Sequence, residues 1–200
     1  MTSPPAVPVG DASRGWDAAA DLLAGHRARS TIGVEVLRDW ARALPAGASV
    51  LDLGCGAGAP VSATLVDLGC RVAGLDGSPR LVAAYRARFP GAEVACAPAE
   101  ASVWFDRPFD AIVAIGLLFL NEEAAQRTII AHMGRATATG GRVLLTAPWQ
   151  TATWIDPTTG LPCRSLGRAE YTRAFARAGL VVEATPTDDG ENHYYALVRQ

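Results

Sequence analysis

Residues 50–60, VLDLGCGAGAP, hold the most distinctive chemistry in the sequence. Apolar residues and Asp52 lead into three alternating glycines, Gly54, Gly56 and Gly58. Glycines that follow a buried strand let the backbone approach a ligand closely, because they carry no Cβ and tolerate positive φ. A carboxylate two residues before the first glycine would repel phosphates and attract a positive charge. The stretch therefore predicts a ligand site at a strand end that favours a cation.

The same residues also fit a dinucleotide site. Gly54-x-Gly56-x-x-Ala59 satisfies the dinucleotide fingerprint, and Asp76 follows about 20 residues later, where a partner for the ribose hydroxyls belongs. In such a site, however, Asp52 would face the phosphates, and the remaining sequence offers no evident residues for hydride transfer. An oxidoreductase that uses NAD or NADP is therefore the alternative function.

Further segments extend the pattern in a fixed order, and together with residues 50–58 they resemble the class I S-adenosylmethionine-dependent methyltransferases. The segments are GLDGSP (74–79), VACAPAE (94–100), FDAIVAIGLLFL (109–120) and GGRVLLTAPW (140–149). The cofactor of that family carries a sulfonium and an ammonium but no phosphate, so an acid at position 52 would attract it rather than repel it.

The resemblance implies that the cofactor is S-adenosylmethionine and that S-adenosylhomocysteine is the product. One departure is Pro98, which stands near the place where many relatives carry an Asp that contacts the adenine amino group. Backbone amides and apolar packing would then hold the adenine. The cofactor-binding residues that the resemblance implies are Asp52, Gly54, Gly56, Gly58, Asp76, Gly77, Ala99, Glu100 and Ile115.

His193 is the candidate general base, because an unperturbed histidine has a pKa of about 6.5 and takes up a proton near neutrality. Glu191 or Asp189 is close enough in sequence to orient it. The last strand is expected to be antiparallel and therefore to begin at the ligand-bearing rim of the sheet, which would place residues 188–195 there and makes Tyr194 a candidate contact of the acceptor. The alternative is that His193 only tethers a hairpin. Methyl transfer requires a base only when the acceptor arrives protonated.

Residues 150–167 form a long connection that we predict to be an acceptor lid loop, with Trp149 and Trp154 as apolar walls. The segment AIGLLFLN lacks the Asn/Asp-Pro-Pro-Tyr/Phe signature of enzymes that methylate exocyclic amines, and no recognition domain is expected. We therefore predict methylation of a small-molecule acceptor, a metabolite or natural product, on O, N or S. A protein that binds the cofactor without methylating anything is a further alternative.

The elements that would position these residues follow from alternating apolar runs and amphipathic stretches. Strands this apolar are buried on both faces, so the sheet is mainly parallel with helices on either side. The prediction is a doubly wound, three-layer, Rossmann-like α/β fold with a mostly parallel seven-stranded sheet and an antiparallel last strand. The expected strands are 48–53, 70–76, 92–97, 109–115, 141–147, 180–186 and 193–199.

The domain organisation expected is a flexible N-terminal arm over 1–14 and one methyltransferase domain over 15–200, with cap helices in 15–45. Trp16 and Arg29 are candidates to close over the methionine end of the cofactor, with ordinary packing and a surface charge as the alternatives.

Composition excludes several partner classes. The net charge is −2 and the basic residues are scattered, which disfavours nucleic acid. The longest apolar run, 111–120, is too short to span a membrane, and we expect a cytoplasmic monomer or homodimer. Cys55, Cys70, Cys96 and Cys163 lack metal-ligand spacing, so no metal is expected and the thiols should be free, most of them buried.

Overall fold

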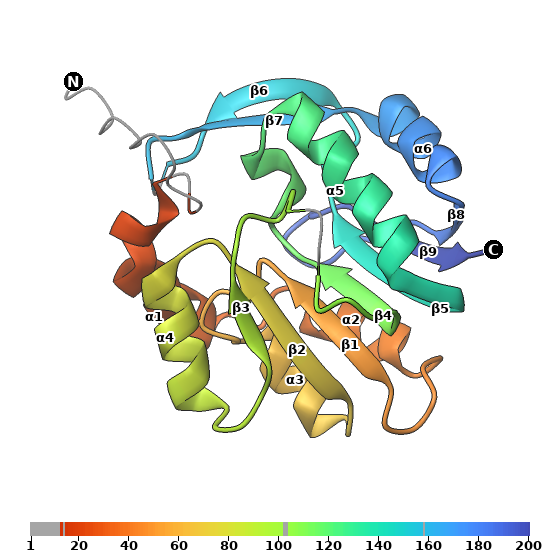
Figure 1. Cartoon of the computed structure of the whole chain (residues 1–200). Helices are drawn as coiled ribbons and strands as arrows, with labels where there is room; N and C mark the ends of the chain where they lie inside the picture. Colours follow the sequence, from red (N-terminus) through yellow and green to blue (C-terminus); the bar gives the residue numbers. More distant parts are fainter. Residues whose placement is uncertain (1–12, 14, 102–103, 158) are drawn as a thin grey trace.

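A central seven-stranded sheet with the order β3-β2-β1-β4-β5-β9-β8 organises the chain (Figure 1). The computed structural model describes residue 13 and residues 15–101, 104–157 and 159–200, so all but residue 13 of the predicted N-terminal arm lies outside the described residues. Strand β9 runs antiparallel to both of its neighbours, β5 and β8. The predicted α/β fold, a mostly parallel sheet with an antiparallel last strand, is confirmed.

The strands coincide with the apolar runs because a strand covered on both faces buries successive side chains. In the first strand the last four residues are all buried. The strands of the sheet are β1 (Ser49–Leu53), β2 (Arg71–Asp76), β3 (Val94–Cys96), β4 (Phe109–Ala114), β5 (Thr137–Thr146), β8 (Leu180–Ala184) and β9 (Tyr194–Arg199).

Helices cover both faces of the sheet. On one face α2 (Val34–Ala41) and α3 (Val61–Asp67) bury Leu37, Trp40 and Leu65 against the strands, and α4 (Pro79–Arg88) packs beside them. On the other face α5 (Glu123–Ala136) and α6 (Arg168–Arg177) bury a second cluster. Near the N-terminus lie the short helix η1 (Trp16–Ala19) and α1 (Ala20–Arg29), and η2 (Leu118–Leu120) follows β4.

Residues 150–167 differ from the predicted loop. They form an antiparallel hairpin of β6 (Thr151–Ile155) and β7 (Pro162–Leu166), with an Asp156-centred turn in which the Asp156 carboxylate accepts from the Thr159 amide. The buried side chain of Gln126 on α5 donates to the carbonyl of Arg164 and accepts from the hydroxyl of Tyr171 on α6. The segment is therefore a strand pair fixed to both helices.

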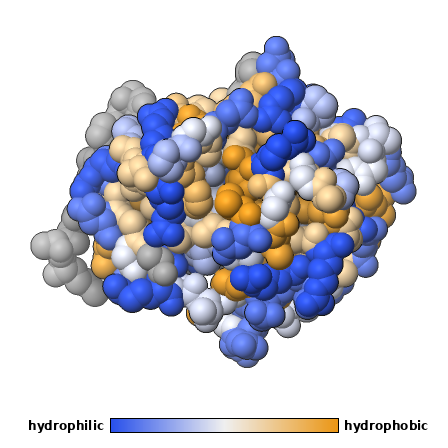
Figure 2. Space-filling model, turned by 90° about the horizontal axis from the view of Figure 1, so that it is seen from below, coloured by the Kyte–Doolittle hydropathy of each residue, from blue (hydrophilic) through white to orange (hydrophobic). Residues whose placement is uncertain are grey.

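Hydrophobic residues are exposed at the lower end of the molecule as drawn in Figure 1. The strands β1 and β2 point upward in Figure 1, and α3 ends at the lower end of the molecule. Seen from below, hydrophobic residues gather near the middle of the view among hydrophilic ones (Figure 2). Val66 and Leu68, at the end of α3, are exposed. No helix in the described part of the chain is long and apolar enough to cross a membrane.

The cysteines follow the sequence prediction in part. The described cysteines are all free thiols. Cys55 and Cys163 are buried as expected, whereas Cys96 is exposed because β3 is a short edge strand of the sheet. Cys70, just before β2, is half-buried.

Gly134 allows α5 to approach α6 closely, and this contact generates a stability prediction. A Cβ at Gly134 would lie 2.2 Å from the carbonyl oxygen of Ala178, which is backbone and cannot rotate away. Gly134→Ala should therefore lower the free energy of unfolding by about 1–3 kcal/mol, measured by chemical denaturation. Gly25→Ala, on α1, meets nothing within 4 Å and serves as the matched control. Equal stability of the two variants would contradict the close contact.

Candidate functional site

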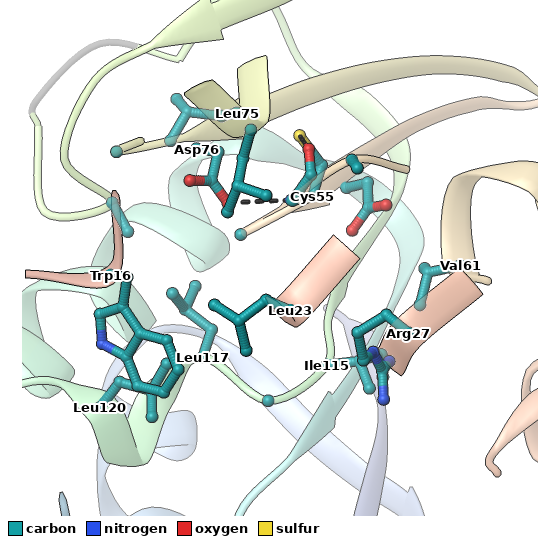
Figure 3. Close-up of a pocket in the computed structure, with 18 of the residues that line it drawn as sticks. Trp16, Leu23, Arg27, Cys55, Val61, Leu75, Asp76, Ile115, Leu117 and Leu120 are labelled. Atoms are coloured by element: carbon teal, nitrogen blue, oxygen red, sulfur yellow. Dashed lines mark hydrogen bonds between the residues drawn. The ribbon is translucent and has the colours of Figure 1, made fainter. Parts of the chain in front are cut away.

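A cavity of about 230 Å³ lies at the carboxyl ends of β1, β2 and β4. Its walls come from the loops after these strands, and η1 and α1 cover it (Figure 3). All of the predicted cofactor residues except Gly58 line it, which confirms that the sequence motifs meet in space. They are Asp52, Gly54, Gly56, Asp76, Gly77, Ala99, Glu100 and Ile115.

Asp76, the last residue of β2, holds two loops together. Its Oδ2 accepts a hydrogen bond from the Gly56 amide at 2.9 Å, drawn as a dashed line in Figure 3, and its Oδ1 accepts from the Ser78 amide at 2.8 Å. Burial raises the pKa of this carboxyl above its ordinary value, and the two amides oppose the shift. The carboxylate therefore has a fixed orientation, and its remaining lone pairs can accept from a ligand hydroxyl.

Asp52 brings a second carboxyl to the cavity. Its side chain is 2% exposed, and Oδ2 accepts from the Ser62 hydroxyl at 2.6 Å. Burial raises the pKa of Asp52 to about 7, and the negative charge of Asp76 adds to this, whereas Ser62 and the positive charge of Arg27 oppose it. A ligand cation at this end of the cavity would stabilise the charged form of Asp52.

The glycines after β1 serve different purposes. Gly56 has a φ of 54° and no atom within 4 Å of the place where a Cβ would stand, so its bare backbone faces open space. Gly58 does not line the cavity, contrary to the prediction. A Cβ there would lie 2.3 Å from the ring of Phe89, because α4 packs directly against this loop. Gly58 therefore fits the loop to the helix, and the cavity is formed without it.

The cap over the cavity consists of η1 and α1, residues 16–29. Trp16, Leu23 and Arg27 line the cavity from this side and face the strand ends (Figure 3). Trp16 was a candidate from the sequence, but the basic residue at the cavity is Arg27 rather than Arg29. The signal was available, since Leu23 and Arg27 stand four residues apart and so share one face of a helix. Leu120 and Asn121, beyond β4, were also missed.

The predicted base is elsewhere. His193 and Glu191 do not line the cavity. The imidazole of His193 stacks on Trp149 with ring centroids 4.1 Å apart, and Glu191 is exposed in the turn before β9. The physical reason is the connection 185–193, in which Asp188 accepts from the Gly190 and Asn192 amides and Thr187 pairs with His193. The structure does not bring this pair to the cavity.

The predicted acceptor residues also lie outside the cavity. Trp149 contacts His193 as described, and Trp154 of the hairpin packs against Phe119 with centroids 5.5 Å apart. Tyr194 is buried and donates its hydroxyl to Asp188 Oδ2 at 2.7 Å, so it does not line an open rim as predicted. Tyr194 borders a small neighbouring hollow. Within the described ranges no group of three or more His, Cys, Asp or Glu side chains could hold a metal.

The buried carboxyl of Asp52 generates a prediction about pH. Its pKa is about 7 in the folded protein and about 3.9 in an unfolded chain, so the folded state binds more protons between these values. The unliganded protein should therefore lose unfolding free energy as the pH rises from about 4 to about 7. Chemical denaturation of wild type and Asp52→Asn across this range isolates the effect. A difference between the two proteins that does not change with pH would contradict the raised pKa.

Comparisons with known proteins agree with this architecture. Residues 50–141 match the family model described as a methyltransferase domain. A comparison with curated protein sequences found no significant match.

Among solved structures, a TehB-like SAM-dependent methyltransferase from Corynebacterium glutamicum is 22% identical with a TM-score of 0.67, over 92% of this chain and 95% of that chain. The glycopeptide N-methyltransferase MtfA with bound S-adenosylhomocysteine is 20% identical with a TM-score of 0.69, over 90% and 97% of the two chains. A chain of the complex between the Haloferax volcanii Trm112 methyltransferase activator and the putative methyltransferase is 18% identical with a TM-score of 0.71, over 94% and 96%.

At these identities the solved structures show that the fold is shared. The family model shows in addition that residues 50–141 are similar to a methyltransferase domain. The matched segment runs from β1 into β5 and contains Asp52, Gly56 and Asp76. The matched segment, the sheet order and the cavity at the strand ends together make the chain similar to the S-adenosylmethionine-dependent methyltransferases of this fold.

Proposed function

We propose that the protein transfers the methyl group of S-adenosylmethionine to a small-molecule acceptor, on O, N or S. The observation that carries the proposal is the pair of carboxyls, buried in Asp52 and half-buried in Asp76, facing one capped cavity at the strand ends. The cofactor supplies a methyl group on a positively charged sulfur, which leaves as a neutral thioether when an acceptor lone pair takes the methyl. The protein has to bind the cofactor, exclude water and orient the acceptor.

The nucleoside end of the cofactor is assigned to the side of the cavity at Asp76. The fixed carboxylate of Asp76 accepts hydrogen bonds from the ribose hydroxyls, and Leu75, Leu81 and Ala99 offer apolar contact to the base. The indole N–H of Trp104 donates to the Ala99 carbonyl at 3.2 Å and so fixes the backbone at that position. This arrangement suits a site where Pro98 replaces the Asp that many relatives carry.

The methionine end is assigned to the opposite side, where Asp52 and Arg27 meet the same cavity. Opposite charges on the two residues match the ammonium and the carboxylate of an amino acid. A dinucleotide would place its phosphates against Asp52, which disfavours it.

The acceptor is assigned to the apolar part of the wall, formed by Trp16, Leu23, Leu117 and Leu120 (Figure 3). Such a wall suits an aromatic or partly apolar molecule. MtfA, which shares the fold, is described as a glycopeptide N-methyltransferase, so natural-product methylation is compatible with this architecture. His193 and Glu191 as a base stay a prediction, since they stand apart from the cavity. We also expect the protein to act in the cytoplasm, as a monomer or homodimer.

Mass spectrometry tests the reaction directly. The protein is incubated with S-adenosylmethionine labelled on the methyl group and a library of small aromatic and apolar compounds carrying hydroxyl, amine or thiol groups. Transfer of the label to a small molecule supports the proposal. Label found only on added RNA or protein, with none on small molecules, would exclude a small-molecule acceptor.

Ligand binding provides the matching residue test. S-adenosylhomocysteine should raise the melting temperature and NAD should not, because Asp52 opposes a pyrophosphate. Asp76→Ala should weaken S-adenosylhomocysteine binding by about 1.5–3 kcal/mol, the scale of a hydrogen bond to a charged group, measured by calorimetry. Asp67→Ala, at the exposed end of α3, is the control. An unchanged affinity in Asp76→Ala would show that the ribose is misplaced.

A further inference from the structure

The N-terminus of α4 is completed by a residue that belongs to the cap. Pro79, the first residue of the helix, has no N–H, and the Leu81 amide donates to the N-cap side chain of Ser78 at 3.1 Å. The remaining amide of this turn, that of Arg80, donates to Asp17 Oδ1 at 3.0 Å. A carboxylate at this position is also favoured by the helix dipole. Asp17 of η1 therefore caps the N-terminus of α4, a role that a residue next to the helix in the sequence usually has.

Ser78 joins Asp17 to the ribose end of the cavity. Its side chain is fully buried, its hydroxyl donates to Asp17 Oδ1 at 2.5 Å, and its amide donates to Asp76 Oδ1 at 2.8 Å. The negative charge of Asp17 also contributes to the raised pKa of Asp76, after burial. The two carboxylates are thus neighbours that share one serine, and a shift of either one changes the surroundings of the other.

Asp17 also sets the position of the residues that close the cavity. Trp16 precedes it directly, and Leu23 and Arg27 follow on α1. A second link, the ion pair of Arg80 with Asp21, lies on the surface, where the Asp21 side chain is 88% exposed. Exposed ion pairs contribute little because water and salt screen them. The bond between Asp17 and the buried hydroxyl of Ser78 is therefore a stronger link between the cap and α4 than this exposed ion pair.

We propose that Asp17 is a positioning residue that latches the cap over the cofactor, and that release of the cofactor requires this latch to open. The inference rests on the proposed function, because it takes the ligand to be the cofactor held at Asp76. It adds a residue that contacts α4 rather than the ligand and that controls how long the ligand stays.

Dissociation kinetics test the latch. Bound, radiolabelled S-adenosylhomocysteine is chased with unlabelled ligand. Asp17→Ala should release it about 10- to 100-fold faster than wild type, the effect of losing a hydrogen bond to a charged group. Asp21→Ala, which removes only the exposed ion pair, should stay within about threefold of wild type. Equal dissociation from Asp17→Ala and wild type would overturn the proposal.

Hydrogen exchange separates a latch from general destabilisation. Without ligand, the amides of residues 16–29 should exchange faster in Asp17→Ala than in wild type, while those of β1 and β4 keep their protection. Loss of protection in β1 and β4 as well would show that Asp17 supports the whole fold and would overturn the latch. Should Asp17→Ala not fold, Asp17→Asn retains an oxygen that accepts from Ser78 and Arg80 but lacks the charge, and an intermediate dissociation rate is expected.

The outcomes also distinguish the two proposals. A wild-type protein that binds no S-adenosylhomocysteine would defeat the proposed function, whereas faster exchange of the cap in unliganded Asp17→Ala would still support the latch. A wild type that binds the ligand normally, together with an Asp17→Ala variant that releases it no faster, would defeat only the latch.

Discussion

The site depends on the double hydrogen bond of the Asp76 carboxylate to the backbone. One oxygen takes the amide of Gly56 from the loop after β1, and the other takes the amide of Ser78 before α4. Because both partners are backbone groups, the bonds fix the course of two loops rather than the rotamers of two side chains. Through Ser78 the same carboxylate is connected to Asp17 and hence to the cap. The loop after β1, the start of α4 and the cap are thus all connected, directly or through Ser78, to the carboxylate of Asp76.

Asp52 illustrates the cost of such a site. Its carboxyl is buried, and the hydrogen bond from Ser62 only partly offsets the loss of hydration. A group of this kind is destabilising to the empty protein and becomes favourable when a cation arrives. Arg27, on the cap rather than on the sheet, brings the opposite charge to the same space. The charge pattern is therefore complete only when the cap is in place.

The sequence predicts the parts of the site that are local along the chain. Asp52, Gly54 and Gly56 follow one strand and Asp76 and Gly77 another, so the rule that ligands bind at the carboxyl ends of parallel strands brings them together. Asp17 escaped because its position depends on contacts with residues more than sixty positions away, such as that between Asp17 and Arg80. No residue pattern within η1 encodes such a contact.

Two segments are arranged differently from the expectation for a similar reason. Residues 150–167 form a hairpin rather than the predicted loop, since β6 (TATWI) and β7 (PCRSL) lack the apolar runs by which strands are recognised, while Gln126 on α5 holds the carbonyl of Arg164 in β7. His193 was placed at the rim from the expected direction of β9, but the turn around Asp188 instead directs its ring onto Trp149. In both cases side-chain hydrogen bonds from distant or irregular segments decided the conformation, and these leave little trace in residue patterns.

If the protein transfers methyl groups as proposed, the cap has a consequence for the rate of multiple turnover. The cap rests on Ser78 and Arg80. If the cofactor binds beneath it as proposed, the spent cofactor would leave, and a fresh one would arrive, by the same opening whichever acceptor is used. Conformational opening of this kind often limits multiple-turnover rates. Acceptors of very different reactivity would then have the same kcat. The preference for one acceptor over another would appear in kcat/KM, which governs the rate at low acceptor concentration.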